Sequence, residues 1–254
     1  MNNPQMSPAQ NMGDDTSRVF AGSFRFEATR QMYAETADLF ANQIRKRFPD
    51  KSQTYVFADI GSFQGELTKE ILEKLPDYHF TIIAIDNNEE ALKKNGTAGK
   101  TILADAGKLP LETKSVDIAI MRYVLQWNPK EKQKQMLKEL LRITKGCILI
   151  EHVGSAIEEP EKWRQQFDHL YDGSVIAKMK RSNYFFSSRD EIEVWMRELG
   201  MTFERINDRV IENGTDVYIE RYALTDDESA QMRDLLGENN FFRQTDWVVF
   251  DSNR

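Results

Sequence analysis

Five short apolar runs alternate with amphipathic stretches between residues 55 and 153 of this 254-residue chain. Near-continuous apolar runs are typical of strands that a parallel sheet buries on both faces. The strands predicted in this way are Tyr55–Ala58, Thr81–Asp86, Thr101–Asp105, Val116–Leu125 and Cys147–Val153. Because the stretches between them carry helical periodicity, the pattern predicts an α/β fold whose parallel sheet is covered by helices on both faces.

Local signals mark where several of the predicted helices begin and end. Pro76 ends the helix that follows the first strand. Asn87 and Glu90 form a cap pair after the second strand, and Ser188 and Glu191 form a capping box for a later helix. These signals place helix starts directly after strands, as in repeated βα units.

The chain beyond residue 200 predicts a β-hairpin. The runs Thr202–Ile211 and Asp216–Leu224 have strand character, and an Asn-Gly turn signal lies between them at residues 213–214. We expect these to be the last two strands. A further helix and the tail Asp246–Phe250 are expected to lie beyond the core.

Shifts in composition indicate one domain with additions. Residues 1–17 are polar and lack the apolar core of a signal peptide, so we expect a disordered N-terminal arm. Residues 18–254 then form a single domain. Within it, 18–48 is a helical stretch before the first strand, 155–187 interrupts the strand–helix alternation, and 225–254 is a C-terminal extension.

Charge and cysteine content narrow the range of partners. The net charge of −7 and the pI near 5.2 argue against a broad phosphate-binding face, so we expect no nucleic-acid partner. A single cysteine excludes an intrachain disulfide framework and favours a reducing, cytoplasmic location. With only three histidines besides, we expect no metal site. We also expect no membrane partner, because no apolar run approaches the ~20 residues of a membrane span.

The segment Asp59–Gly65 closes the first predicted strand and opens the next helix. Gly61 and Gly65 remove side-chain atoms where the backbone must turn sharply or approach a ligand, and the helix start presents unpaired N–H groups. Asp59 stands at the carboxyl end of the strand, where α/β sheets bind ligands. A dinucleotide loop needs Gly-x-Gly-x-x-Gly for its pyrophosphate. Here an acid comes first and Phe63 lies between the glycines, which suits a cationic ligand better than NAD.

Acids also end the second and third predicted strands. Asp86 follows Gly65 by 21 residues, a position at which an acid can accept hydrogen bonds from both ribose hydroxyls. Asp105 ends the third strand and is followed by Ala106. The three strand-end acids therefore indicate one ligand site along the carboxyl edge of the sheet.

With these features in this order, residues 55–224 resemble the class I S-adenosylmethionine-dependent methyltransferases that act on small molecules. The resemblance implies a Rossmann-like seven-stranded sheet, mostly parallel, with the last strand antiparallel. It also implies that 18–48 forms a helical lid over the cofactor and that 155–187 is a substrate-cap insertion.

The resemblance further assigns residues to the cofactor S-adenosyl-L-methionine. Asp59 and Gly61 are expected to hold its methionine end and Asp86 its ribose. Asp105 is expected to bond the adenine amino group, with the Ala106 backbone at the ring. The complete set of expected cofactor-binding residues is Asp59, Gly61, Ser62, Gly65, Asp86, Asn87, Asp105, Ala106 and Arg122.

Residues for the methyl-transfer step are harder to identify, because the leaving group is a neutral thioether that needs no acid. Alignment alone can supply ~7–11 kcal/mol, and a base is required only if the acceptor still holds a proton. His152, after the fifth strand, is the candidate base, with a purely structural histidine as the alternative. Tyr123 lines the site or merely packs, and Arg122 pairs with an acidic acceptor or bridges to a neighbouring acid at the surface. Gln126-Trp127 is similar to the pair in trans-aconitate and malonyl-carrier-protein methyltransferases, which methylate carboxylates.

We therefore expect methyl transfer to a small-molecule acceptor, on oxygen, nitrogen or carbon. The insertion and the acidic charge favour a metabolite over nucleic acid. Two alternatives stay open. One is a protein methyltransferase whose two terminal segments shape a peptide groove, and the other is an S-adenosylmethionine-binding protein or enzyme of this fold that transfers no methyl group.

Overall fold

The computed structural model describes residues 27–155, 187–211, 216, 219, 225–236 and 242–250. Its strands are β1 (Thr54–Ile60), β2 (His79–Asp86), β3 (Lys100–Leu103), β4 (Val116–Arg122), β5 (Thr144–Ser155), β6 (Thr202–Val210) and β7 (Phe242–Phe250). Its helices are α3 (Glu27–Arg47), α4 (Glu66–Lys74), α5 (Glu89–Lys93), the 3₁₀ turn η1 (Leu125–Trp127), α6 (Lys130–Ile143), α9 (Arg189–Glu198) and α11 (Asp226–Leu236). The predicted arm 1–17 and nearly all of the predicted cap 155–187 lie outside the described residues.

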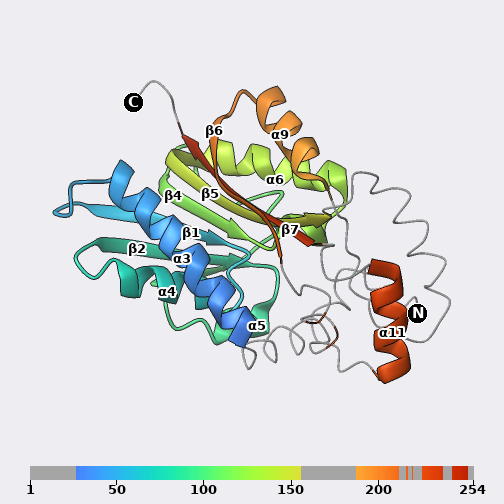
Figure 1. Cartoon of the computed structure of the whole chain (residues 1–254). Helices are drawn as coiled ribbons and strands as arrows, with labels where there is room; N and C mark the ends of the chain where they lie inside the picture. Colours follow the sequence, from blue (N-terminus) through green and yellow to red (C-terminus); the bar gives the residue numbers. More distant parts are fainter. Residues whose placement is uncertain are drawn as a thin grey trace, which may run out of the picture.

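The seven strands form one sheet in the order β3-β2-β1-β4-β5-β7-β6 (Figure 1). Neighbours from β3 to β5 pair in parallel. Strand β7 runs antiparallel to β5 and to β6, so it alone is reversed. The predicted fold class, a mostly parallel Rossmann-like sheet with its last strand antiparallel, is therefore confirmed. The strand order reverses between β1 and β4, which is where such sheets bind ligands.

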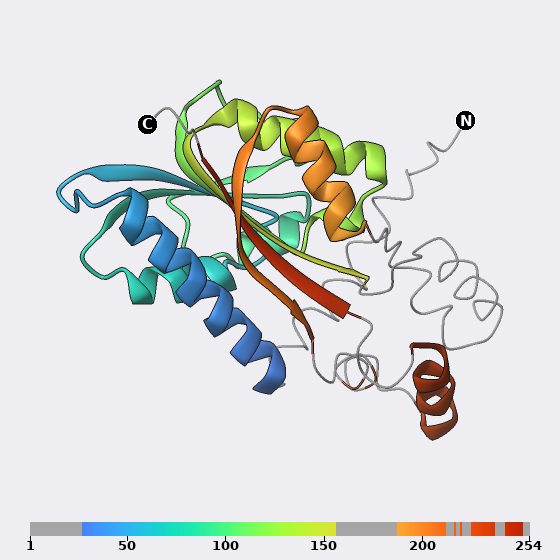
Figure 2. The same cartoon turned by 45° about the horizontal axis from the view of Figure 1, so that its top comes forward.

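Helices cover both faces of this sheet, with α3 and α4 on one side and α6 and α9 on the other (Figures 1 and 2). Residues of β4 alternate between the two layers because successive strand side chains point to opposite faces. Ile118 and Ile120 join the cluster that contains Phe40 of α3. Ala119 and Met121 join the cluster of α6 and α9. The same alternation decides which face each polar side chain near the strand ends occupies.

Helix α3 falls within the stretch 18–48 that the sequence predicts as a lid. Ala37, Phe40, Ala41 and Ile44 of this helix are fully buried in the cluster with α4 and the sheet. Such residues form the helical stripe that an amphipathic helix turns toward a core. The C-terminal half of α3 is thus a fixed layer of the fold rather than part of a movable lid.

The predicted C-terminal hairpin is wrong in its second strand. Strand β6 matches the run Thr202–Ile211, but its partner is β7 at residues 242–250, which the sequence reading placed in a tail beyond the core. Of the stretch Asp216–Leu224, the structure describes Asp216 and Ile219, both in helical conformation. Strand β7 lies between β5 and β6 and is buried on both faces from Gln244 to Val249. A strand in the middle of a sheet has to be buried on both faces, as β7 is. The Asn-Gly signal reflected only the local preference of two residues for a turn.

The predicted helix caps are mostly confirmed. Ser188 and Glu191 form the capping box of α9, with the Glu191 N–H 3.2 Å from the Ser188 hydroxyl. The cap of α5 lies one residue later than predicted, because Asn88 rather than Asn87 accepts the hydrogen bond from the N–H of Ala91. None of the helices that the structure describes combines the length and the apolar character of a membrane-spanning segment.

Candidate active site

The loop between β1 and α4 uses left-handed backbone at alternate positions. Gly61, Phe63 and Gly65 have φ angles of 74°, 47° and 87°. A Cβ atom on Gly61 would lie 2.2 Å from a methyl carbon of Val124, so this glycine lets the loop approach the segment after β4. Phe63, which lies between the two glycines, adopts the glycine-like conformation itself. The loop therefore keeps the sharp path that the glycine pattern predicts.

Asp86, at the end of β2, holds this loop in place. Its Oδ2 accepts the Phe63 N–H at 2.8 Å, and its Oδ1 accepts the Asn88 N–H at 2.9 Å. Burial raises the pKa of this carboxyl, while backbone hydrogen bonds oppose the rise. Each carboxylate oxygen has a second lone pair, so both can still accept a ligand hydroxyl. Asn87, the other residue predicted here, is exposed.

Asp59, at the end of β1, is a buried carboxyl in an acidic neighbourhood. Thr68 of α4 donates its hydroxyl to Asp59 Oδ2 at 2.6 Å. Burial raises the pKa of Asp59 to about 7; Asp86 and Glu66 raise it further, whereas Thr68 and Arg122 lower it. A carboxyl in this state binds a cation favourably, because the cation compensates the charge that burial disfavours. Ser62 in the same loop is also buried, and its hydroxyl has no hydrogen-bond partner among the described residues.

Asp105 lies after β3 and has a more open environment. Its Oδ1 accepts the Gly107 N–H at 2.7 Å, and its Oδ2 is 2.6 Å from Nζ of Lys132 on α6. Although burial opposes the change, the hydrogen bond from Lys132 lowers the pKa of Asp105. The neighbouring Ala106 is partly buried and packs against the α6 side of the core. Both residues lie beyond the end of β3, next to β2, at the predicted carboxyl edge.

Arg122 ends β4, and the predicted surface position of this arginine is wrong. Its side chain is 5% exposed, and its Nε is 2.6 Å from Oε2 of Glu151. The guanidinium lies between two rings, 3.6 Å from the centre of Tyr33 and 4.1 Å from that of Tyr123. The predicted pairing with an acid is correct, but it occurs in the interior. Tyr123 has a φ of 56°, so the chain leaves the extended conformation at this residue. The ring of Tyr123 lies against Arg122.

His152 lies on the opposite face from Arg122 and Glu151. It is 1% exposed, and its Nε2 is 2.9 Å from the carbonyl oxygen of Ser187, just before α9. Because a carbonyl only accepts, Nε2 carries the proton and Nδ1 has the lone pair. Nδ1 is buried and has no partner among the described residues. Burial lowers the pKa of His152 to about 4, so the ring is neutral at pH 7. A Cβ atom on Gly154 would lie 3.1 Å from Nε2, so this glycine makes room for the ring.

A row of polar residues crosses four strands on the α3 face, and sequence reasoning missed most of it. Register partners place Arg122 of β4 beside Glu151 of β5, Glu151 beside Asp246 of β7, and Asp246 beside Asn207 of β6. Asn207 donates to Asp246 Oδ2 at 2.7 Å, and the side chain of Gln244 donates to the same oxygen at 3.1 Å. The available signal was an acid, Glu151, next to His152 inside a predicted strand that is otherwise apolar.

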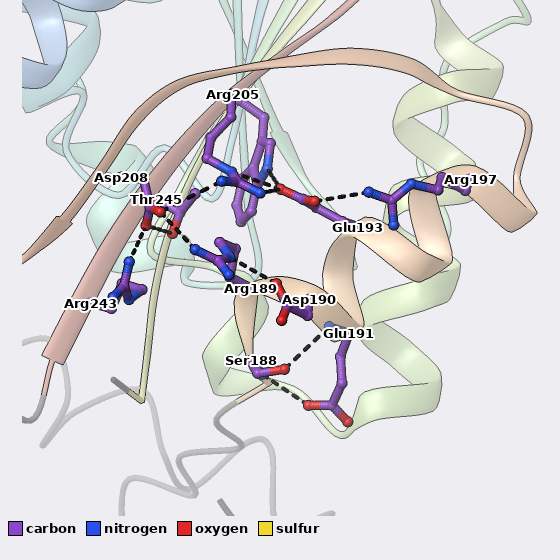
Figure 3. A network of polar contacts seen from close by, with 11 residues as sticks. Ser188, Arg189, Asp190, Glu191, Glu193, Arg197, Arg205, Asp208, Arg243 and Thr245 are labelled. Carbon is purple, nitrogen blue, oxygen red and sulfur yellow. Dashed lines mark hydrogen bonds and ion pairs between the residues drawn. The ribbon is translucent and has the colours of Figure 1, made fainter. Parts of the chain in front are cut away.

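A second polar network fixes α9 to β6 and β7 (Figure 3). Glu193 of α9 accepts from Arg205 at 2.7 Å. Asp208 of β6 accepts from Arg189 at 2.7 Å and from Arg243 at 2.8 Å. Although burial opposes the change, these two arginines lower the pKa of Asp208. Glu193 and Asp208 are each matched by arginines, so this network holds together the elements that flank His152.

Comparisons with known proteins agree with this architecture. Residues 58–147 match the family model described as a methyltransferase domain, which spans β1 through the start of β5. A comparison with curated proteins finds no match. The structure is similar to that of the YcgJ protein from Bacillus subtilis, with a TM-score of 0.64 and 15% identity, covering 86% of this chain and 99% of that one.

Two further similar structures are methyltransferases with S-adenosylhomocysteine bound. The plantazolicin methyltransferase BpumL has a TM-score of 0.58 and 15% identity, covering 96% of this chain and 94% of that one. The geranyl diphosphate C-methyltransferase of Streptomyces coelicolor A3(2) has a TM-score of 0.57 and 13% identity, covering 98% and 86%. The family match and the fold agree with the resemblance seen in the sequence: residues 58–147 are a methyltransferase domain, and the sheet around them has the fold of these S-adenosylhomocysteine-bound methyltransferases.

Proposed function

We propose that this enzyme transfers a methyl group from S-adenosylmethionine to a small-molecule acceptor. The observation that carries the proposal is the charge pattern at the carboxyl edge. Buried or half-buried carboxyls of Asp59, Asp86 and Glu66 surround the loop after β1, and the guanidinium of Arg122 is close enough to lower the pKa of Asp59. The methionine end of the cofactor carries a sulfonium, an ammonium and a carboxylate, so this arrangement matches it in sign.

Each cofactor-binding residue then has a defined partner. Asp59 faces the cationic methionine end, close to Gly61 and Ser62. Arg122 pairs with the methionine carboxylate through guanidinium donors other than Nε, which binds Glu151. Asp86 accepts from the ribose hydroxyls through its remaining lone pairs, while it continues to hold the loop.

The adenine end belongs to the loop after β3. Asp105 accepts from the adenine amino group, and Lys132 fixes the orientation of its carboxylate. Ala106 lies against the ring, and Asn87 stands beside the ribose after β2. Gly65 contributes through its left-handed backbone, which aims the first N–H groups of α4 at the ligand.

The bound sulfonium supplies an electrophilic methyl group, and the protein aligns the acceptor with the carbon–sulfur bond. The chain's own residues orient the acceptor, exclude water and accept a proton where the acceptor has one. His152 is the candidate base through Nδ1, because Ser187 fixes the proton on Nε2. Tyr123 lines the part of the site where the methyl acceptor binds, since the backbone turns at this residue after the end of β4. Alignment contributes up to ~7–11 kcal/mol, so a weak base suffices.

A metabolite is the acceptor that fits this chain best. The net charge of −7 opposes binding to a polyanion, and we propose no nucleic-acid partner. The single cysteine, Cys147, is buried and free, as in proteins of the reducing cytoplasm, where we place this enzyme.

Two measurements test the proposal. Calorimetry should show saturable binding of S-adenosylhomocysteine and none of NAD; the reverse pattern would refute the assignment of the cofactor. Incubation with a radiolabelled methyl donor and cell extract, followed by size fractionation, should place the label in small molecules. Label confined to protein would show a protein methyltransferase, and absence of label with intact cofactor binding would show that no methyl group is transferred.

A further inference from the structure

Two carboxyl groups lie side by side in the polar row beneath α3. Glu151 and Asp246 are register partners of β5 and β7, so their side chains leave the same face of the sheet at adjacent positions. Both residues are 0% exposed. Two ionised carboxylates at adjacent register positions in the interior would repel each other, because little solvent screens them.

The hydrogen bonds of each carboxyl account for one of its oxygens. Glu151 Oε2 is bound by Arg122 Nε at 2.6 Å, and Asp246 Oδ2 accepts from Asn207 and Gln244. The other oxygens, Glu151 Oε1 and Asp246 Oδ1, are buried and have no hydrogen-bond partner among the described residues. Buried polar atoms without a partner are rare in native proteins. A proton bound by one of these carboxyls would give it a donor for the other, its register partner.

We propose that Glu151 and Asp246 form a proton-binding site, in which a single proton shared by Oδ1 and Oε1 keeps the buried row electrically neutral. Arg122 then balances Glu151, and Asp246 is the neutral member. The site rests on the paired geometry of β5 and β7 and is independent of which acceptor the enzyme methylates.

The charged groups around the pair support one retained proton. Burial raises the pKa of Glu151, while Arg122 of β4, the Thr36 hydroxyl of α3 and Arg209 of β6 oppose the rise. Arg122 balances a single negative charge. Arg209 is already paired with Glu35 of α3. The remaining neighbours, Asn207, Gln244 and Thr36, are neutral. Burial, and then the charge of Glu151, raise the pKa of Asp246 to about 8.

The shared proton is also a condition for docking α3. Gln244 links Asp246 to the Thr36 hydroxyl of α3 at 3.3 Å, and Tyr33 of the same helix stacks on Arg122. The helix therefore contacts the row through neutral groups and a ring. A second buried negative charge would attract Arg122 away from the Tyr33 ring and disfavour the docked helix.

Proton linkage gives a direct test. Asp246 has a folded-state pKa near 8 and an unfolded one near 4, so its stabilising contribution is complete in acid and is lost as pH rises toward 8. Between pH 5 and 7, the unfolding equilibrium constant of the natural protein should rise about tenfold more per pH unit than that of Asp246→Asn. The amide is a mimic of the protonated acid, because its NH₂ can donate to Glu151 Oε1, and we expect this variant to fold.

A matched control separates this site from ordinary carboxylates. Asp208→Asn removes a carboxyl of lowered pKa in the neighbouring strand, so it should leave the slope between pH 5 and 7 unchanged. Infrared spectra at pH 6.5 should also show protonated-carboxyl absorption from Asp59 and from the pair, and Asp246→Asn should remove the part that the pair contributes. Equal slopes for the natural protein and Asp246→Asn, with no protonated-carboxyl band lost, would overturn the proposal and show that both groups are ionised.

Discussion

At the scale of single residues, Asp86 has two roles, binding the ribose and holding the glycine loop, and substitutions can separate them. Asp86→Ala removes the acceptor for the ribose and also releases the Phe63 N–H that fixes the glycine loop. A lost charge-assisted hydrogen bond costs about 1.5–3 kcal/mol, which corresponds to roughly 10- to 150-fold in affinity. Calorimetry with S-adenosylhomocysteine should show this loss. Asp86→Asn is the control, because it keeps an oxygen for the loop and should bind more tightly than the alanine variant. Equal affinities for both variants and the natural protein would show that Asp86 serves the loop alone.

Asp59 predicts a pH dependence of cofactor affinity. Its pKa is about 7 in the free protein because it is buried. The ammonium group of S-adenosylhomocysteine favours the ionised form of Asp59, so affinity for this ligand should increase as pH rises from 5.5 to 7 and level off above pH 8. Ligand binding at pH 6.5 should release protons, which calorimetry in buffers of different ionisation enthalpy detects. Asp59→Asn should bind weakly at every pH. An unchanged pH profile in that variant would assign the titration to another group.

At the scale of elements, the loop after β1 depends on Gly61. A Cβ atom there would lie 2.2 Å from Val124, and the φ of 74° disfavours any side chain. Gly61→Ala should therefore displace the loop, weaken cofactor binding at least about tenfold and lower the melting temperature by several degrees. Gly61→Ala combined with Val124→Ala should recover part of this loss, because the double variant removes the clash but keeps the strained φ. Gly96→Ala is a suitable control, since a Cβ atom there meets nothing within 4 Å.

Elements up to residue 155 could be predicted from the sequence because their signals are local. Apolar runs, glycines and helix caps marked each βα unit, and the strand ends placed Asp59, Asp86 and Asp105 along one edge. Strand β7 could not be found in this way, because its partners β5 and β6 lie far away in the sequence. For the same reason the pairing of Glu151 with Asp246 could not be predicted from the sequence. It exists only once the register of two distant strands is known.

At the scale of the whole molecule, the burial of α3 limits how far the N-terminus can be truncated before the fold is lost. Removing residues 1–17 should have little effect on stability, because that segment has few apolar residues to bury. Removing residues 1–48 deletes Phe40 and Ile44 from the core, and each buried side chain of this size contributes roughly 1.5–3 kcal/mol. Such a loss is comparable to the total stability of a domain. Thermal unfolding followed by circular dichroism should show no cooperative transition in the longer truncation. A cooperative transition near the original temperature would mean that α3 is dispensable.

The central position of β7 has a consequence for the order in which the ribosome completes this domain. In the part of the chain that the structure describes, β6 pairs only with β7, and β7 is the last strand of the sheet to be synthesised. While residues 242–250 are still inside the exit tunnel, β5 and β6 each have an open edge and cannot join. The first five strands can assemble during translation, since N-terminal parts of a chain fold first. The sheet closes only after β7 has emerged, and until then the free edge of β5 and the unpaired strand β6 are where a nascent chain is most exposed to wrong pairing.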